Sequence, residues 1–241
     1  MPAGSYEGKT KIVSPAKSPT NVILRFKNDI TALDGEKHDV IEGKGAINAS
    51  ISSKLFELLN RAGLPTHFIR RDGPDGIVVK KLRMLPLEVV CRNVAAGHFA
   101  KRFSTLFKIG EALSKPVVEF YLKSDELHDP LLTEDHISLL GIASDEQVET
   151  MKELTLRTNG LVSKYLDDLG IRLVDFKLEF GLDEDDRLVI GDELALDSMR
   201  LWDKDTGSRL DKDVYRSGKP LDDVLSVYRE AYRRIVGREA P

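Results

Sequence analysis

The segment from Leu173 to Gly181, LVDFKLEFG, alternates apolar and charged side chains with the two-residue period of a β-strand. On such a strand the apolar and the charged side chains take opposite faces: Val174, Phe176, Leu178 and Phe180 on one, Asp175, Lys177 and Glu179 on the other. The acidic run 183–186 predicts a turn into a second short strand, which brings Asp192 near Glu179. Two carboxylates with an amine between them suit a complex of Mg²⁺ with a polyphosphate, because Mg²⁺ takes one or two protein carboxylates together with phosphate oxygens. A solvated hairpin face crossed by ion pairs is the structural alternative.

The composition describes an ordinary globular chain. Its 241 residues, 41% hydrophobic and 32% charged, suit one large domain or two lobes. A net charge of −4 argues against a dedicated nucleic-acid binder, which normally carries a basic excess. The single cysteine, Cys91, excludes an intramolecular disulfide, and its apolar neighbours favour a small buried side chain over a nucleophile. No apolar run approaches the ~18 residues of a membrane span, and the N-terminus lacks a signal-peptide core, so we expect a cytoplasmic protein.

Short strands are expected up to about residue 92, and helices are expected to take over from about residue 93. The predicted strands cover residues 11–13, 21–26, 66–69, 76–80 and 87–90. The predicted helices cover residues 47–59, closed by Gly63, then the segment from a capping box at Ser144 to Gly170, and finally a helix that starts near Pro220. We therefore predict an α+β fold with antiparallel sheets, in which residues 1–85 form a strand-rich N-terminal lobe and residues 86–241 a mixed C-terminal lobe with terminal helices.

Several familiar site patterns are incomplete in this chain. Gly4 to Thr10 is similar to a Walker A loop, but it is one residue short and no strand precedes it. The histidines are too scattered for zinc-ligand spacing, and the run 203–207 lacks the closing Glu of a calcium loop. No Gly-x-Ser-x-Gly nucleophile elbow is present.

Basic residues instead stand where phosphate groups could bind. Lys9 and Lys11 follow Gly8 and point to one side of a strand, although a solvated strand end would have the same pattern. Residues 79–88 are a possible crossing between lobes, where an adenine could lie on apolar side chains near Met84. Arg92 and the small residues before His98 suggest an anion site at a helix start. The turn at residues 128–130 fits a structural role as well as a catalytic one.

Seven short motifs carry a resemblance to a known family: Gly8 to Lys11, Lys80 to Leu82 with Met84 and Pro86, Arg92-Asn93 with residues 95–97, and residues 128–130, 175–181, 191–193 and 200–203. Their order and spacing, from about residue 5 to residue 235, resemble the phosphoribosylaminoimidazole-succinocarboxamide synthase (SAICAR synthetase) family. The resemblance implies an ATP-grasp-like, kinase-resembling fold of two lobes, with nucleotide bound by the N-terminal lobe and substrate by the C-terminal lobe, usually in a homodimer. It implies an ATP-dependent ligase of de novo purine biosynthesis that joins L-aspartate to carboxyaminoimidazole ribonucleotide through an acyl phosphate, giving SAICAR, ADP and phosphate. The implied partners are these small molecules, without nucleic acid or membrane.

The resemblance also implies a role for each matching residue. The catalytic residues would be Lys177, Asp175 and Asp129. ATP would be bound by Gly8, Lys9, Thr10, Lys11, Lys80, Met84, Lys123, Glu179 and Asp192, of which Glu179 and Asp192 would hold Mg²⁺. The other substrates would be bound by Arg92, His98, Asp197, Arg200, Lys212 and Arg216.

Two loops depart from the family pattern. His98 stands where the family commonly has Ser, and an imidazole binds phosphate best when it is protonated. Residues 195–199 read Ala-Leu-Asp-Ser-Met in place of the usual Ser-Pro-Asp-Gly-Ser, which changes the backbone freedom of that loop.

Two other functions stay open. A small-molecule kinase of similar fold would stop at phosphoryl transfer and release ADP without needing an amine. A non-catalytic nucleotide-binding or interaction protein would keep the core pattern but lose the charged residues, which this chain retains at Asp175, Lys177, Glu179 and Asp192.

Overall fold

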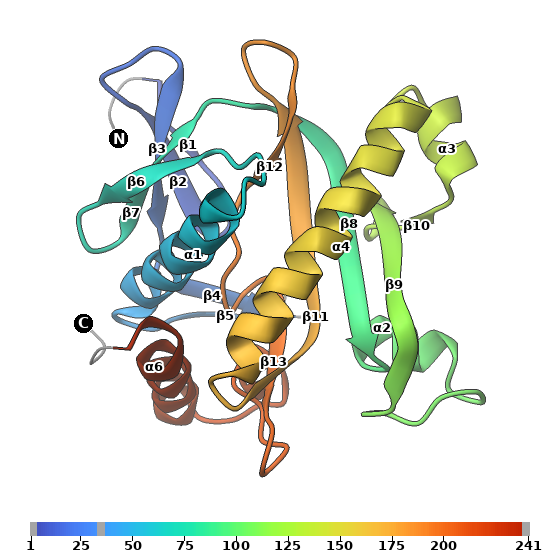
Figure 1. The fold of residues 1–241 in the computed structure, drawn as a ribbon. Coiled ribbons are helices and arrows are strands. Elements are labelled where there is room, and N and C mark those ends of the chain that lie inside the picture. The colour runs from blue at the N-terminus through green and yellow to red at the C-terminus, as the bar shows by residue number, and fades with distance from the viewer. Residues whose placement is uncertain (1–3, 33–36, 238–241) are drawn as a thin grey trace.

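Three antiparallel sheets frame the structure, a computed structural model that describes residues 4–32 and 37–237 (Figure 1). The first sheet has the order β1–β2–β3–β7–β6: β1 (Tyr6–Glu7), β2 (Lys11–Pro15), β3 (Asn21–Phe26), β6 (Phe68–Asp72) and β7 (Gly76–Lys80). The second has the order β10–β9–β8–β11–β12, with β13 also paired to β11: β8 (Arg83–Val94), β9 (Ala112–Leu122), β10 (Leu131–Leu132), β11 (Ile171–Leu182), β12 (Leu188–Gly191) and β13 (Met199–Asp203). The third is the hairpin of β4 (Asp29–Ala32) and β5 (Lys37–Val40).

Helices cover the sheets. Their bounds are α1 (Lys44–Arg61), α2 (Gly97–Arg102), the 3-10 turn η2 (Asp125–Leu127), α3 (Glu134–Leu139), α4 (Asp145–Asp167), α5 (Asp213–Arg216) and α6 (Leu221–Val236). Figure 1 shows α4 lying across the second sheet, where it packs on β11, β8 and β9, while α1 packs on β3, β6 and β7 and against α6. The predicted capping box of α4 is confirmed, because Ser144 Oγ accepts from the Gln147 backbone N–H (3.2 Å) and Gln147 Oε1 accepts from the Ser144 N–H (3.0 Å).

One hydrophobic cluster joins the two large sheets. It includes Leu24 and Ile77 of the first sheet, Val89 and Phe176 of the second, and Leu55 of α1. The prediction of a mixed fold with antiparallel sheets is therefore confirmed, and both sheets are anchored in the same core.

A bulge in β11 corrects the predicted strand faces. The pairing of β11 with β13 shifts register between Leu173 and Asp175. Leu173 and Phe176 both belong to the main core, whereas Val174 packs in a separate small cluster with Val94 and Ala96. The extra residue of a bulge reverses the alternation locally, so the prediction that Val174 shares a face with Phe176 is wrong.

The strand β9 was not predicted, because helices were expected from about residue 93 up to the hairpin that begins at Leu173. It pairs with β8 along most of its length and contains the β-favouring run Val117 to Leu122. Pro116 interrupts the pattern, but it lies where the pairing with β8 shifts register and where β10, which pairs only with residues 120 and 121, gives it no second neighbour. A proline is tolerated at such a position because no ladder hydrogen bond is lost.

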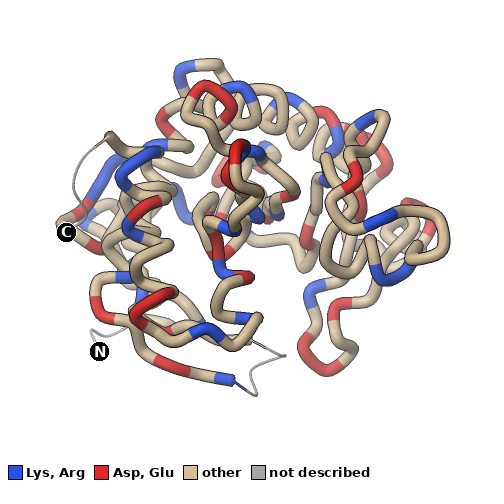
Figure 2. The backbone as a smooth tube through the Cα atoms, turned by 90° about the horizontal axis from the view of Figure 1, so that it is seen from below, with Lys and Arg blue, Asp and Glu red and all other residues tan. Residues whose placement is uncertain are grey.

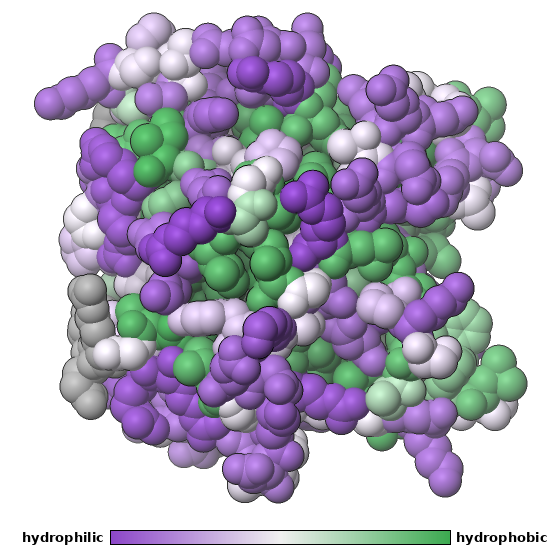
Figure 3. Space-filling view, in the orientation of Figure 1, coloured by the Kyte–Doolittle hydropathy of each residue, from purple (hydrophilic) through white to green (hydrophobic). Residues whose placement is uncertain are grey.

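The surface mixes both signs of charge. Figure 2 shows Lys and Arg interspersed with Asp and Glu over the backbone, and on the face in Figure 3 apolar side chains are seen mainly in a band across the middle. Within residues 4–32 and 37–237, no helix is long and apolar enough to cross a membrane. Cys91 is fully buried, as predicted, and burial raises the pKa of its thiol to about 12.

Candidate active site

Two adjoining cavities lie along the charged face of β11, with volumes of about 550 and 560 Å³. Four residues line both: Glu88, Asp129, Lys177 and Asp197. The first, called here the lysine pocket, is also lined by Tyr6, Gly8, Lys9, Thr10, Lys11, Val13, Thr31, Lys123, Asp125, Glu179, Asp192, Glu193 and Lys212. The second, called the arginine pocket, is also lined by Val90, Arg92, His98, Tyr121, His128, Asp175, Phe176, Ser198, Met199, Arg200 and Arg216.

Lys177 lies at the boundary of the two pockets, between two glutamates. The β8–β11 register sets Glu179 opposite Glu88, and Lys177 Nζ donates to Glu88 Oε1 (2.7 Å) and to Glu179 Oε1 (2.9 Å). The other oxygen of Glu179 accepts from Lys123 Nζ (2.6 Å). Burial by itself would lower the pKa of Lys177, but the carboxylates of Glu179 and Glu88 outweigh it and hold that pKa well above its usual value. Lys177 therefore stays a cation in the pocket.

Lys11 of the N-terminal sheet forms a second acid–lysine group with the two acids that follow β12. Lys11 Nζ lies 2.9 Å from Asp192 Oδ1 and 3.1 Å from Glu193 Oε1. Burial would raise the pKa of the Asp192 carboxyl, but Lys11 and then Lys177 outweigh it and keep that pKa well below its ordinary value. The register of the β11–β12 hairpin pairs Glu179 with Gly191, so Asp192 follows directly after the residue opposite Glu179, as predicted. The lysine pocket is thus lined by carboxylates and ammonium groups that are paired with one another.

Asp197, which lines both pockets, belongs to a buried ion pair. Lys44 Nζ, at the start of α1, lies 2.6 Å from Asp197 Oδ2, and the hydroxyl of Tyr228 on α6 donates to Asp197 Oδ1 (2.7 Å). Lys212 lies nearby, and its pKa is lowered by burial and by the charge of Lys44. Glu193 Oε2 is buried and, within the residues described, has no hydrogen-bond partner.

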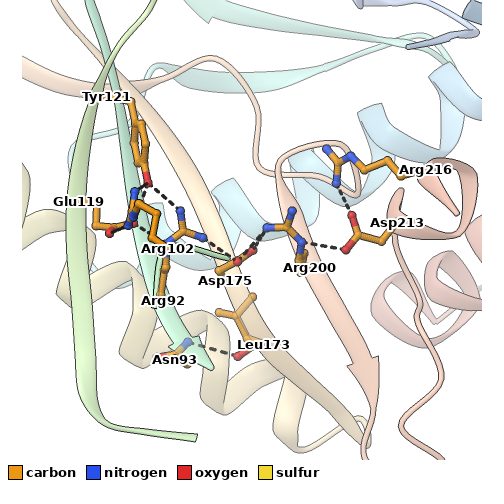
Figure 4. A network of polar contacts seen from close by, with 10 residues as sticks. All are labelled: Arg92, Asn93, Arg102, Glu119, Tyr121, Leu173, Asp175, Arg200, Asp213 and Arg216. Carbon is orange, nitrogen blue, oxygen red and sulfur yellow. Dashed lines mark hydrogen bonds and ion pairs between the residues drawn. The ribbon is translucent and has the colours of Figure 1, made fainter. Parts of the chain in front are cut away.

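The arginine pocket is organised around one buried carboxylate (Figure 4). Asp175 accepts from Arg92 Nη1 (3.1 Å) and from Arg200 Nη1 (2.9 Å), which lie on the two strands that flank β11. Arg92 also donates from Nε to Glu119 (2.5 Å) and from Nη2 to the Tyr121 hydroxyl (3.0 Å), so its planar group is held on three sides. Two guanidinium groups fixed beside one acid form a cationic wall of the kind that binds phosphate or carboxylate.

The start of α2 fits closely against Arg200. Gly97 has φ of +52°, and a Cβ built on it would lie 2.8 Å from the Arg200 guanidinium carbon, so no other residue fits there without displacing Arg200. The next residue, His98, lines the arginine pocket. The pKa of its imidazole is lowered by partial burial, with Lys101 and Arg200 acting in the same direction.

Asp129 occupies a strained turn between the pockets. His128 and Asp129 both have left-handed backbone angles, with φ of 56° and 47°. Asp129 Oδ1 accepts from the Ser124 N–H (2.8 Å), which supports the turn. Strain of this kind persists only where the surrounding structure holds it and often marks functional sites.

All but two of the predicted site residues line one of the two pockets. The exceptions are Lys80 and Met84. Lys80 lines a third cavity, of about 540 Å³, together with Arg83 and Arg187. Met84 lies over β11, where a Cβ on Gly181 would be 3.1 Å from Met84 Sδ. The structure therefore does not bring Lys80 to the lysine pocket, but it brings Met84 next to Gly181 of β11 and next to Gly191 of β12, the residue before Asp192.

Several polar residues of the site were missed by sequence reasoning: Lys44, Glu88, Glu119, Tyr121, Glu193 and Asp213. Glu88 carried a usable signal, because it alternates with the apolar Leu87 and Val89 and so had to face away from the core. Lys44 carried no usable signal in the sequence. It is the first residue of an amphipathic helix, and its partner Asp197 is 153 positions away in the sequence.

The carboxylates of the lysine pocket offer oxygen donors for a divalent cation. Among the residues described, no group of three or more His, Cys, Asp or Glu side chains is arranged to hold a metal ion. Mg²⁺ needs fewer protein ligands than that, since it keeps waters and takes phosphate oxygens. Glu179 and Asp192, with the unpartnered Glu193 Oε2 beside them, fit such a partial donor set.

Known proteins match this chain over nearly its whole length. Residues 4–235 match the sequence profile of the family described as SAICAR synthetase. A phosphoribosylaminoimidazole-succinocarboxamide synthase of Methanopyrus kandleri is 47% identical over 96% of this chain and 92% of its own length. A structure of SAICAR synthetase in complex with ADP superposes with a TM-score of 0.93 at 44% identity, covering 98% of this chain and 99% of that one. A phosphoribosylaminoimidazole-succinocarboxamide synthase structure from Ehrlichia chaffeensis gives a TM-score of 0.91 at 42% identity, covering 95% and 97%.

Proposed function

The chain belongs to the SAICAR synthetase family and is a carbon–nitrogen ligase of purine biosynthesis, and we propose that it joins L-aspartate to carboxyaminoimidazole ribonucleotide at the expense of ATP. The products would be SAICAR, ADP and phosphate. The observation that carries the proposal is the shared boundary of the two pockets, where Lys177 lies between a pocket suited to a polyphosphate and a pocket suited to a phosphorylated substrate.

ATP is assigned to the lysine pocket. A related SAICAR synthetase has been solved with ADP, and the ammonium groups of Lys9, Lys11 and Lys123 line the pocket from several sides. Gly8 and Thr10 form the turn that carries the first two lysines, with the Gly8 N–H donating to the Lys11 carbonyl (2.8 Å). We further assign the adenine to the neighbourhood of Met84, and Lys80 to the outer edge of the nucleotide site.

Glu179 and Asp192 are the residues that would hold Mg²⁺. Bound there together with ATP, the ion would neutralise charge on the β- and γ-phosphates. In the structure these carboxylates are paired with Lys123, Lys177 and Lys11. The same ammonium groups can turn to phosphate oxygens when nucleotide enters, so the pocket exchanges one set of charge pairs for another.

The ribonucleotide is assigned to the arginine pocket. Arg92 and Arg200 would clamp its 5′-phosphate, with His98 contributing one N–H, because a guanidinium fork matches phosphate oxygens in a way that an ammonium group does not. Asp197 lines both pockets, Lys212 the lysine pocket and Arg216 the arginine pocket, and we propose that the rest of the substrate and the incoming aspartate would meet them there.

The chemistry explains why two pockets must share a wall. A carboxylate is a poor electrophile, so we propose that the γ-phosphoryl group of ATP is first transferred to the substrate carboxylate, and that the amine of aspartate then displaces phosphate from the acyl phosphate. Such transfers depend on positioning and charge neutralisation. Lys177, which lines both pockets, would neutralise the transferring group, while Asp175 bonds the two arginines and Asp129 also lines both pockets.

We extend the proposal to the whole molecule. Residues 1–85 would act as the nucleotide lobe and residues 86–241 as the substrate lobe of an ATP-grasp-like, kinase-resembling fold, since the first large sheet ends at Lys80 and the second begins at Arg83. We propose that the enzyme works in the cytoplasm as a homodimer, with no nucleic acid or membrane partner.

A coupled product assay tests the proposed function. The protein is incubated with Mg²⁺-ATP and carboxyaminoimidazole ribonucleotide, with and without L-aspartate, while ADP and the amide are both measured. We expect amide to form only with aspartate, in a one-to-one ratio with ADP. ADP release that does not depend on L-aspartate, without amide formation, would instead identify a kinase. If neither ADP nor amide formed, the assigned substrate would be wrong.

A further inference from the structure

We propose that Glu119 is a positioning residue of the arginine pocket, which holds the Arg92 guanidinium in the orientation that receives an anionic group of the substrate. The inference rests on the proposed assignment of the ribonucleotide phosphate to that pocket. Arg92 lines the pocket and Glu119 does not, so Glu119 would act through Arg92.

The pairing of β8 with β9 brings the two side chains together. Val90 lies opposite Glu119, and Arg92 lies opposite Val117, so Glu119 and Arg92 are diagonal neighbours on one face of the sheet. Their side chains are only 9% and 5% exposed, and Arg92 Nε donates to Glu119 Oε2 at 2.5 Å. The carboxylate therefore contacts the inner end of the guanidinium, away from its two terminal nitrogens.

The other oxygen of the same carboxylate holds a second part of the pocket wall. Glu119 Oε1 accepts from Arg102 Nη2 (Figure 4). Arg102 is the last residue of α2, the helix that begins at Gly97 against Arg200 and whose second residue, His98, lines the pocket. One carboxylate thus ties α2 to the strand that carries Arg92.

Tyr121, two residues further along β9, completes the network. Its hydroxyl donates to Glu119 Oε2 (2.9 Å) and accepts from Arg92 Nη2 (3.0 Å) and from Arg102 Nη1 (2.8 Å). A hydroxyl has one donor and two acceptor positions, so all of them are used. Glu119 and Tyr121 therefore fix the orientation of Arg92 together.

The network leaves part of Arg92 available to a ligand. A guanidinium has five N–H groups. Arg92 uses Nε–H with Glu119, one N–H of Nη1 with Asp175 and one N–H of Nη2 with Tyr121. Within residues 4–32 and 37–237, the remaining N–H on each terminal nitrogen has no hydrogen-bond partner. Because the three bonds fix the plane of the group, these two donors are preorganised for an anion.

Charge complementarity alone does not explain an acid beside a phosphate site. By its charge, Glu119 repels an anion in the pocket, so a purely electrostatic view predicts tighter anion binding in Glu119→Gln. The positioning role predicts the opposite. The amide nitrogen of Gln cannot accept a hydrogen bond, so it cannot hold Arg92 and Arg102 at once. The sign of the change therefore separates the two views.

Calorimetric titration of the whole protein with carboxyaminoimidazole ribonucleotide measures this change without turnover. We expect Glu119→Gln to raise the dissociation constant by about 10- to 100-fold, as when a residue that orients a ligating side chain is removed. Tyr121→Phe keeps every charge and loses only the hydroxyl, so we expect a rise of about 3- to 10-fold. In steady-state assays KM for the ribonucleotide should rise, while kcat and KM for ATP stay within about 2-fold, because the lost contact binds ground state and transition state alike.

Two controls separate positioning from stability. Phe120→Leu alters the same strand, but its side chain packs in the main core, so it should lower the melting temperature and leave the dissociation constant unchanged. In an Arg92→Gln background, Glu119→Gln should change the affinity by less than about 2-fold, because its effect passes through Arg92. Wild-type or tighter binding by Glu119→Gln, or its full effect in the Arg92→Gln background, would overturn the inference.

The two proposals fail in different ways. If the wild type binds the ribonucleotide but forms no amide, the proposed reaction is wrong, and the affinities of the variants still test Glu119. If the wild type does not bind the ribonucleotide, the assigned substrate is wrong, and the same titrations with inorganic phosphate test Glu119. Normal ligase activity of the wild type together with unchanged affinity in Glu119→Gln would keep the proposed function and reject the role of Glu119.

Discussion

Lys44 Nζ lies 2.6 Å from Asp197 Oδ2, in a pair whose side chains are only 1% and 3% exposed. The pair joins the first residue of α1 to the loop between β12 and β13, and Tyr228 of α6 adds a hydrogen bond to the same carboxylate. Burial would raise the pKa of Asp197, but Lys44 and Lys212 outweigh it and keep that pKa well below its ordinary value.

Asp197→Asn should destabilise the protein markedly at neutral pH. It leaves the buried Lys44 ammonium without a counter-charge, and breaking a buried pair in this way costs about 3–5 kcal/mol of unfolding free energy. Because the folded-state pKa of Asp197 is lowered, its contribution is present above the ordinary Asp pKa and is lost as the pH falls below it. Urea unfolding at pH 7 and at pH 3 should therefore show the difference between wild type and variant shrinking in acid. Asp168→Asn, at an exposed ion pair, should have little effect at either pH.

Glu179→Gln should abolish most activity while the protein stays folded. The substitution keeps the shape of the side chain but removes the charge that Lys123 and Lys177 contact and that would hold Mg²⁺. Loss of one preorganised electrostatic contact typically lowers the rate by about 100- to 1,000-fold. ADP formation measured over a range of Mg²⁺ concentrations gives the effect. Glu153→Gln on the exposed face of α4 serves as control, and equal activity of the two variants would argue against a site at Glu179.

Arg200→Lys should weaken binding of the ribonucleotide without changing that of ATP. Arg200 bonds Asp175 from Nη1 and Asp213 from Nε (2.8 Å), and a single ammonium group cannot reproduce this fork. Loss of one charged hydrogen bond is worth about 1.5–3 kcal/mol, or about a 10- to 100-fold rise in KM for the ribonucleotide. Steady-state kinetics with each substrate varied in turn separates the two KM values. A matching rise in KM for ATP would contradict the assignment of Arg200 to the arginine pocket.

His98 should make ribonucleotide binding depend on pH. The pKa of its imidazole is lowered, so the ring is neutral at pH 7 and becomes a cation only as the pH falls below the ordinary His value of about 6.5. A protonated ring attracts phosphate more strongly, so KM for the ribonucleotide should fall between pH 7 and pH 5.5 relative to that of His98→Ser. The Ser variant carries the same titration of the substrate phosphate and so isolates the contribution of the ring. Parallel pH profiles of the two proteins would exclude this role.

The sequence predicted those parts of the fold that depend on local pattern. The hairpin of β11 and β12, the capping box at Ser144 and the last helix all appear as predicted, because alternation, capping and helical period are properties of neighbouring residues. β9 and the bulge at Val174 were missed because no pattern of neighbouring residues indicates them clearly. Pro116 obscured the first, and the second exists only through the pairing of β11 with β13.

In the candidate site, too, residues in short motifs could be predicted, whereas residues that depend on tertiary contacts could not. Residues in short motifs, such as Lys177 and Glu179, could be proposed directly from the sequence. Lys44 and Glu119 could not, because each acquires its role from a partner brought close by the tertiary fold.

The long-range lysine pairs also bear on how the chain is made. Lys11 and Lys44 emerge from the ribosome early, whereas their acidic partners at Asp192, Glu193 and Asp197 emerge much later. Until residues 192–197 arrive, both ammonium groups lack the carboxylates that compensate their burial in the finished fold. The nascent N-terminal half should therefore stay partly open at this end until residues 192–197 arrive. A chain stalled before that point would be an expected target for chaperones and proteases.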